Sequence, residues 1–250
     1  MYIAPPIVVK GTVSGGLISE WAIGRLRWVS RPIVWVAAAL VVASFLVAAG
    51  CDSVKQGSGV ESTETRDVGD FNRISVSGQT DVEVTIGATQ TVTVRGDDNL
   101  ISNVELETDD GELDISEEDG LDLRPAVGLT VEIVVPQLEG VSISGSADTQ
   151  INGLSGGVFR AEVSGSGSVE AVGDINRAEA EVSGSGVVRF ERLIAREVEA
   201  NVSGSGSIDV FASESLDASV SGSGEIVYSG DPPTLDTEVS GDGDISARAG

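Results

Sequence analysis

The chain has 250 residues and carries 40 acidic against 15 basic side chains, which gives a net charge of −25 at neutral pH. Such a field repels phosphate groups, so the composition excludes nucleic acid as a partner and disfavours anionic lipid headgroups. The sequence contains one cysteine and no histidine. An intramolecular disulfide cannot form, the usual Cys and His ligands of zinc sites are lacking, and histidine-dependent catalysis is excluded.

Residues 1–50 are predicted to be an export signal and lipoprotein leader. Three arginines, Arg25, Arg27 and Arg31, precede an uncharged apolar stretch that ends in small residues at Cys51. A basic flank, an apolar core and small residues before a processing point are typical of a secretory signal. The end of the stretch resembles a bacterial lipobox, in which the cysteine thiol is acylated and the chain is cut before it. The alternative is an uncleaved signal anchor, since the stretch is nearly long enough to span a bilayer.

A lipid on Cys51 determines the expected location of the rest of the chain. Two or three acyl chains anchor a protein stably, and arginines beside an apolar stretch stay on the cytoplasmic side. We therefore expect the chain after Cys51 to lie in the cell envelope, on the extracytoplasmic face of the plasma membrane. Residues 51–68 are rich in Ser, Thr, Gly and charge, which predicts a flexible tether.

Residues 69–140 contain short segments in which aliphatic and polar residues alternate. Examples surround Ile74, Val82, Val92, Leu113 and Val131, and turn signals such as Gly-Asp-Asp-Asn over 96–99 separate them. Alternation of period two between turn residues predicts strands. Because the terminal coils of solenoids cap the core, we expect this part to form irregular first coils of the same architecture as the segment that follows.

Residues 141–250 repeat a five-residue motif, Val-Ser-Gly-Ser-Gly or a near variant, six times. The intervals between the central glycines are 18 to 20 residues. Those glycines are Gly145, Gly165, Gly184, Gly204, Gly222 and Gly241. A period this short has no room for a helical hairpin and fits about three short strands. The sequence therefore predicts an all-β fold, a parallel β-helix with about 19 to 20 residues per coil.

Alignment of the repeats on the central glycine predicts which side chains face inward. Aliphatic residues stand two positions before the glycine and again four positions after it, and they alternate with polar residues. The column two positions before the glycine contains Ile143, Val163, Val182, Val202, Val220 and Val239. Stacked coils would turn each column into a ladder of like side chains. The first repeat is expected to leave this register after its motif, where Thr149 and Ile151 stand.

The serines beside the glycines are predicted to point outward, and two interpretations remain open. They are corner residues whose hydroxyls satisfy nearby backbone groups, or they form an interaction face. The candidate face comprises Ser164, Ser166, Ser183, Ser185, Ser203, Ser205, Ser221 and Ser223. A long, flat strip of this kind suits an extended partner, either an envelope protein or a second copy of the chain. The last coil has no evident cap and is expected to leave an open strand edge.

Two functions are alternatives to a purely structural role: catalysis on polysaccharides, and binding of calcium or another ligand. Polysaccharide-active enzymes are built on β-helices, but this chain shows no nucleophile–base pair, so catalytic residues are predicted to be absent. Calcium or ligand binding is the other alternative. Its candidate residues are Asp109, Asp110, Glu112 and Asp114; Glu117, Glu118, Asp119 and Asp122; and Asp242 and Asp244. None of these groups matches a known calcium loop, so neither a metal nor a cofactor is predicted.

Several motifs in order resemble one bacterial family. They are Phe71-x-x-Ile74-x-Val76-x-Gly78, Asp110-Gly-Glu-Leu113, Val131-x-Ile-x-Val-Pro136 and the Gly-Ser-Gly repeats. Over about residues 69–250 the chain is similar to the GIN domains, which are named as autotransporter adhesin heads. The resemblance implies a right-handed β-helix and an envelope location, often as a lipoprotein. It implies little about activity, and the expected function is that of a non-catalytic structural or adhesive module.

Overall fold

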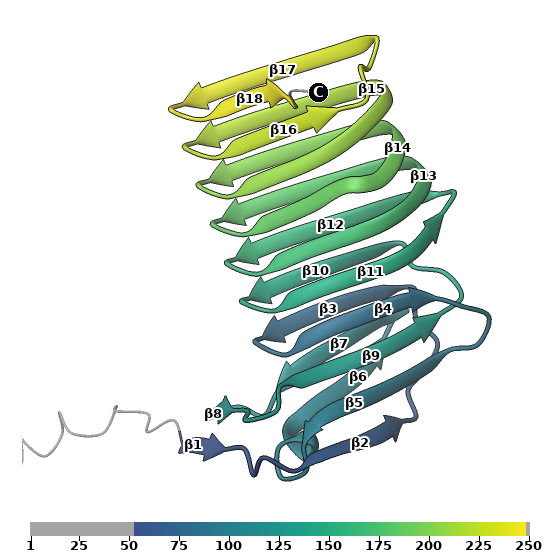
Figure 1. Ribbon diagram of the computed structural model, residues 1–250, viewed down its shortest axis with the longest axis vertical. Helices are drawn as coiled ribbons and strands as arrows, with labels where there is room; N and C mark the ends of the chain where they lie inside the picture. The colour runs from purple at the N-terminus through teal and green to yellow at the C-terminus, as the bar shows by residue number, and fades with distance from the viewer. Residues whose placement is uncertain (1–52, 249–250) are drawn as a thin grey trace, which may run out of the picture. The chain divides into compact units, whose positions relative to one another are not determined.

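The structure is a computed structural model that describes residues 53–248 (Figure 1). The predicted leader and Cys51 lie outside these residues. Within these residues the chain forms strands almost throughout, with one short 3₁₀ helix. The elements are β1 Ser53–Gln56, β2 Glu61–Arg66, β3 Arg73–Gly78, β4 Asp81–Ile86, β5 Thr91–Asp97, η1 Ile101–Asn103, β6 Val104–Asp109, β7 Glu112–Glu117, β8 Leu121–Arg124, β9 Leu129–Val135, β10 Gly140–Gly145, β11 Asp148–Ser155, β12 Val158–Gly165, β13 Ser168–Gly184, β14 Val187–Gly204, β15 Ser207–Gly222, β16 Glu225–Ser229, β17 Thr234–Gly241 and β18 Asp244–Ala247.

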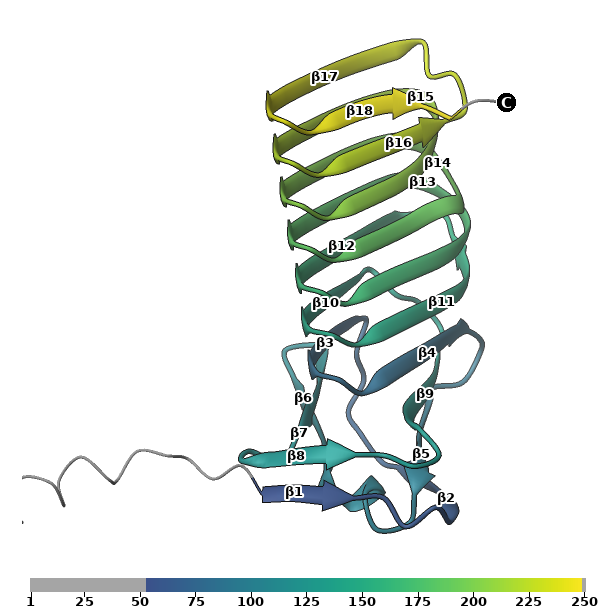
Figure 2. The same ribbon diagram turned by 60° about the vertical axis from the view of Figure 1, so that its left-hand side comes forward.

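Successive coils stack into a parallel β-helix, as predicted (Figures 1 and 2). Each coil contributes to two faces, whereas about three short strands per coil were expected. The first face contains β7, β3, β10, β12, the second halves of β13, β14 and β15, and β17. The second face contains β9, β4, β11, the first halves of β13, β14 and β15, and β16 and β18. Because β13, β14 and β15 bend from the second face to the first, one sheet of 16 strands wraps around the core.

The inward columns predicted from the repeats form the core. Val163, Val182, Val202 and Val220 pair in register along the first face, and none of them is more than 2% exposed. At about 25 cal/mol for each Å² of apolar surface removed from water, each buried valine contributes about 1.5 to 3 kcal/mol. The ladder of valines therefore stabilises each coil through its two neighbours.

The predicted loss of register after the first motif is wrong. Thr149 pairs with Val169 and Ile151 with Ala171, so β11 keeps the ladder. Thr149 is buried, and its hydroxyl has no hydrogen-bond partner among the described residues. The register shifts only beyond Asn152, beside Gly153. The backbone ladder therefore tolerates a polar side chain in an aliphatic column.

Each Ser-Gly-Ser-Gly corner requires glycine for two different reasons. The central glycine, such as Gly204, has a φ of +131°, which disfavours any side chain, and a Cβ there would lie 2.5 Å from the carbonyl oxygen of Gly184 in the previous coil. The second glycine, such as Gly206, has no positive φ. Its Cβ would lie 2.6 Å from the carbonyl oxygen of Gly186. A side chain at either position would therefore collide with the coil before it.

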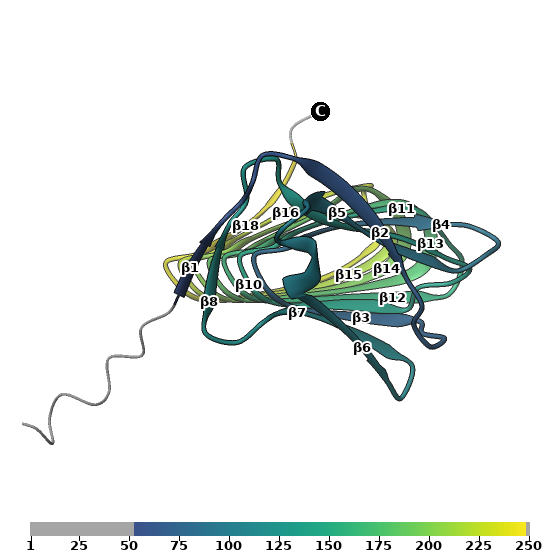
Figure 3. The same ribbon diagram turned by 90° about the horizontal axis from the view of Figure 1, so that it is seen from below.

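The N-terminal end of the solenoid is closed by irregular elements. Strands β3 and β4 form a parallel coil above β7 and β9, whereas β2, β5 and β9 pair antiparallel, as do β6 and β7. Seen along the solenoid, η1 covers the end of the coils (Figure 3), and its first residue Ile101 and the preceding Leu100 are buried in the core. Residues 69–140 are therefore a mixture of parallel coils and antiparallel ribbons rather than irregular coils alone.

The prediction of a flexible tether over residues 51–68 is wrong for residues 53–66. These residues form β1, which pairs with β8, and β2, which pairs with β5. Their polar composition reflects exposed strands: β1 forms a separate two-stranded sheet with β8, and β2 lies at an edge of the 16-stranded sheet. None of the helices within residues 53–248 has the length and apolarity that a membrane span requires.

Candidate functional site

The eight candidate serines lie in two exposed columns along the corner that joins the first face to the second. Their backbone groups hold the corners together: the amide of Ser185 donates to the carbonyl of Gly165 at 2.9 Å, and Ser205 donates to Gly184 at 2.8 Å. Within the described part of the chain, the eight hydroxyls make no hydrogen bond to other protein groups. The interpretation that these hydroxyls satisfy backbone groups is therefore wrong. We call these two columns the serine edge.

The outward side of the first face carries a column of charged residues. Successive coils place its members in register, in the order Glu112, Arg73, Gly140, Arg160, Glu179, Glu199, Asp217 and Asp236. The column has arginines toward its N-terminal end and carboxylates alone in its last four coils. We call it the charged column.

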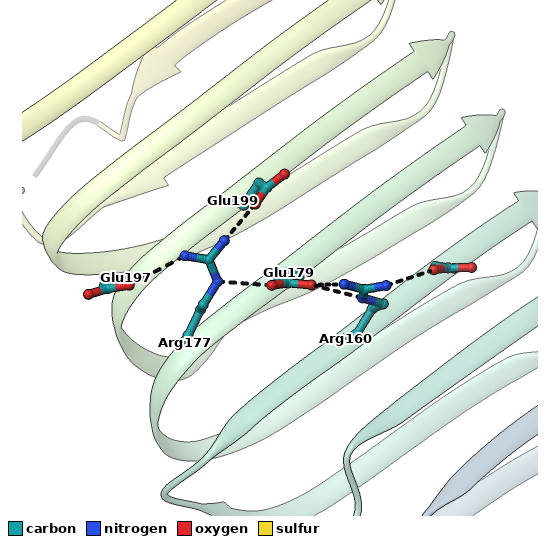
Figure 4. A network of polar contacts seen from close by, with 6 residues as sticks. Arg160, Arg177, Glu179, Glu197 and Glu199 are labelled. Atoms are coloured by element: carbon teal, nitrogen blue, oxygen red, sulfur yellow. Dashed lines mark hydrogen bonds and ion pairs between the residues drawn. The ribbon is translucent and has the colours of Figure 1, made fainter. Parts of the chain in front are cut away.

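Two arginines organise the middle of the first face (Figure 4). Arg177 contacts Glu179 at 2.9 Å on its own strand, and on the next coil it contacts Glu199 at 2.6 Å and Glu197 at 3.4 Å. Arg160 donates from Nε to Glu179 at 2.8 Å. Hydrogen bonds from Arg160, and to a lesser degree from Arg177, lower the pKa of the Glu179 carboxyl. These side chains are partly exposed, so the network contributes modestly to stability and mainly fixes the positions of the charges.

A groove of about 610 Å³ opens where the charged column is interrupted by Gly140. Glycine leaves a gap between Arg73 on one side and Arg160 on the other, and Glu139 and Glu162 also line it. Each arginine already has a carboxylate partner: Arg73 pairs with Glu112 at 3.3 Å, and Arg160 pairs with Glu179. The groove therefore offers paired charges and backbone groups rather than a free cation.

Glu179, which lines the groove, lacks the property that the acid of a glycoside hydrolase needs. Glycoside hydrolysis needs one carboxyl group with a raised pKa to act as the acid, whereas the pKa of Glu179 is lowered. Burial, and to a lesser degree the charge of Asp148, raises the pKa of the Asp81 carboxyl. Asp81 does not line the groove. The carboxyl group with a raised pKa, Asp81, and the one with a lowered pKa, Glu179, are therefore not brought together in the groove.

Several of the candidate calcium ligands form structural contacts instead. Glu117 accepts hydrogen bonds from the Gln79 amide and the Thr80 hydroxyl, and Glu118 accepts one from Asn103. Glu112 and Asp122 pair with arginines. Among residues 53–248, no cluster of three or more acidic side chains is arranged to hold a metal ion.

Sequence reasoning missed the arginine network and one buried acid. Arg160 and Glu179 stand 19 residues apart, one repeat period, so the signal for their pairing was present in the sequence. Asp97 is buried and accepts hydrogen bonds from the amides of Gly59, Ala126 and Val127, at 2.6, 2.8 and 3.2 Å. No periodic pattern marks Asp97, because its three donors come from loops distant in sequence.

Comparison with known proteins places this geometry in a family. The family model described as "Putative auto-transporter adhesin, head GIN domain" matches residues 70–232. A crystal structure named as a putative adhesin of Bacteroides fragilis is 25% identical, covers 78% of this chain and 100% of its own, and has a TM-score of 0.66. Another, named as a putative adhesin of Parabacteroides distasonis, is 22% identical with a TM-score of 0.50, at 78% and 100% coverage, and supports the fold alone. No curated protein matches the chain significantly.

Proposed function

Because the chain belongs to the family described as "Putative auto-transporter adhesin, head GIN domain", we propose that it is a non-catalytic, lipid-anchored module of the cell envelope. Its role is structural or adhesive. It binds an extended macromolecular partner, an envelope protein or a second copy of itself, along the serine edge.

The serine edge is the observation that carries this proposal. Its hydroxyls are exposed, without protein partners among residues 53–248, and repeated from coil to coil at about 4.8 Å, the spacing of neighbouring strands. Small-molecule sites are concave and mostly apolar. A straight and repetitive edge instead matches a partner that is itself extended.

The position of Cys51 supports attachment to a membrane at the N-terminal end. Only one residue separates Cys51 from the start of β1 at Ser53, and a fully extended chain spans at most about 3.6 Å per residue. A lipid on Cys51 would therefore hold the N-terminal end of the solenoid at the membrane surface. The serine edge would then run away from that surface, where a partner can reach it.

The enzyme alternative receives less support than binding. Glu179, the carboxylate held between two arginines beside the groove, has a lowered pKa and stays ionised at neutral pH. An acid catalyst would have to be protonated there. The calcium alternative likewise has no observation in its favour among the described residues.

Photocrosslinking in the native cell tests the proposed binding. A photoreactive residue is placed at Ser185 or Ser223 on the serine edge, and a control is placed at Arg189, which is exposed on the second face. We expect discrete crosslinked products from the two serine positions and few from Arg189. Equal products from all three positions, or none from the serines, would contradict the proposal.

A further inference from the structure

The outer edge of β17 has no strand beside it among residues 53–248. Within residues 53–248, β17 pairs only with β15. Leu235 and Val239 are 47% and 46% exposed, whereas Leu216 and Val220, which occupy the same columns one coil earlier, are 1% exposed. The aliphatic ladders therefore continue to this edge, where their last side chains are about half exposed.

Among residues 53–248, the corner carbonyl at this edge also lacks a hydrogen-bond partner. In each earlier corner the carbonyl of the central glycine accepts an amide from the next coil: Gly204 accepts from Ser223 and Gly222 from Asp242, both at 2.8 Å. No amide among the described residues donates to the equivalent carbonyl of Gly241. A strand laid parallel to β17 would complete both the aliphatic ladder and the hydrogen bonds.

The charges along this edge specify the partner. Asp236 lies in register with Asp217, and Glu238 stands two residues further along the same outward side. None of the three forms an ion pair among residues 53–248. In earlier coils of this face, arginines neutralise the stacked carboxylates: Arg160 pairs with Glu179, and Arg177 pairs with Glu199. Like charges directly opposite each other are destabilising, so the edge favours a neighbour that carries cations.

We propose that the β17 edge binds an extended basic segment of a partner protein, added as a parallel strand. Aliphatic residues of that segment cover Leu235 and Val239, and lysine or arginine at the alternate positions pairs with Asp236 and Glu238. A second copy of this chain that placed its own β17 against this edge would add further unpaired carboxylates, so a basic segment is the better match. This inference rests on the proposed function and specifies its partner.

A synthetic octapeptide tests this edge directly. The probe has the sequence of residues 158–165 with Glu162→Arg, so that arginines occupy both positions that would face Asp236 and Glu238 in the register of the coils. The control peptide has the natural Glu162 and carries Arg160→Glu. Binding of each fluorescein-labelled peptide to the full-length protein in detergent is measured by fluorescence anisotropy.

Two variants of equal charge locate the site. Asp236→Lys with Glu238→Lys reverses the charges of the edge, whereas Asp174→Lys with Glu181→Lys makes the same change at exposed acids away from it. We expect the basic probe to bind saturably and to lose about tenfold or more in affinity with the edge variant, because two attractions become repulsions. The distant variant should bind almost normally, and the acidic peptide should bind only the edge variant.

Hydrogen exchange provides a second readout. Bound probe should slow amide exchange in residues 234–241 and leave residues 177–184 unchanged. The inference is overturned if the probe does not bind saturably, if both variants weaken it equally, or if the protein instead associates end to end in sedimentation. These outcomes concern the edge alone, so they are distinguishable from a failure of crosslinking at Ser185 and Ser223.

Discussion

At the scale of single residues, the close stacking of the coils depends on corner glycines, which have no Cβ atom. The second glycine of each corner leaves room for a valine of the preceding coil: a Cβ on Gly206 would lie 2.4 Å from Cγ1 of Val182. The valine column and the glycine column are therefore two sides of one packing arrangement. A change at either position acts on both neighbouring coils.

Gly204→Ala is expected to destabilise the protein by about 3 kcal/mol. A side chain at positive φ costs about 1 to 2 kcal/mol, and overpacking against the Gly184 carbonyl adds about 1 to 3 kcal/mol. Gly120→Ala is the control, since Gly120 has a φ of +76° but a Cβ added there would meet no atom within 4 Å. Its cost should be only about 1 kcal/mol. Urea unfolding of both variants would show equal losses if contact between coils did not matter.

Val202→Asp and Ser205→Ala together test which side chains face the core and which face solvent. Val202 is 2% exposed within the valine ladder, and an unpaired carboxylate there should cost about 3 kcal/mol or more. Ser205 is exposed and its hydroxyl has no partner within residues 53–248, so its removal should be nearly neutral. Thermal or urea melts that shift equally for the two variants would show that the assignment of faces is incorrect.

At the scale of elements, Asp97 joins three loops at the N-terminal end of the solenoid. Its carboxylate accepts from Gly59, which follows β1, and from Ala126 and Val127, which precede β9. Burial raises the pKa of Asp97, but the backbone donors outweigh burial and hold it below the ordinary value of 3.8. The ionised carboxylate therefore fixes loops that the strand ladders leave free.

The lowered pKa of Asp97 predicts an acid-sensitive contribution to stability. The contribution is fully present above the ordinary value of 3.8 and is lost as the pH falls through the lower folded-state pKa. Asp97→Asn should destabilise the protein at pH 7, because the amide replaces a charged acceptor for three donors. The difference from the natural protein should shrink below about pH 4. Urea midpoints measured from pH 7 to pH 3 would oppose this account if the difference stayed constant.

The elements differ in how far their sequences predict them. The coils after residue 141 follow from a fixed period, because each repeat meets its own pattern in the next coil. The ribbons formed by β2, β5 and β6 do not follow, because alternation alone does not distinguish parallel from antiparallel pairing. The pairing of Arg177 with Glu199 also requires the bend lengths of successive coils, which vary from repeat to repeat.

At the scale of the whole molecule, the two ends of the solenoid differ. The N-terminal end is covered by η1 and its buried neighbours, whereas the β17 edge exposes its ladders. Charge follows the same axis on the first face, with Arg73 and Arg160 early in the charged column and carboxylates alone in its last four coils. A molecule held at its N-terminal end would therefore present an acidic, extendable end away from its anchor.

The central claim is that this solenoid acts in the cell envelope while held by a lipid on Cys51. Mass spectrometry of the N-terminal peptide of the protein, isolated from its native membrane, tests the claim most directly. We predict a peptide that begins at Cys51 and carries the mass of attached acyl chains, and that Cys51→Ser abolishes this species. A peptide that retains leader residues, or an unmodified Cys51, would contradict the account.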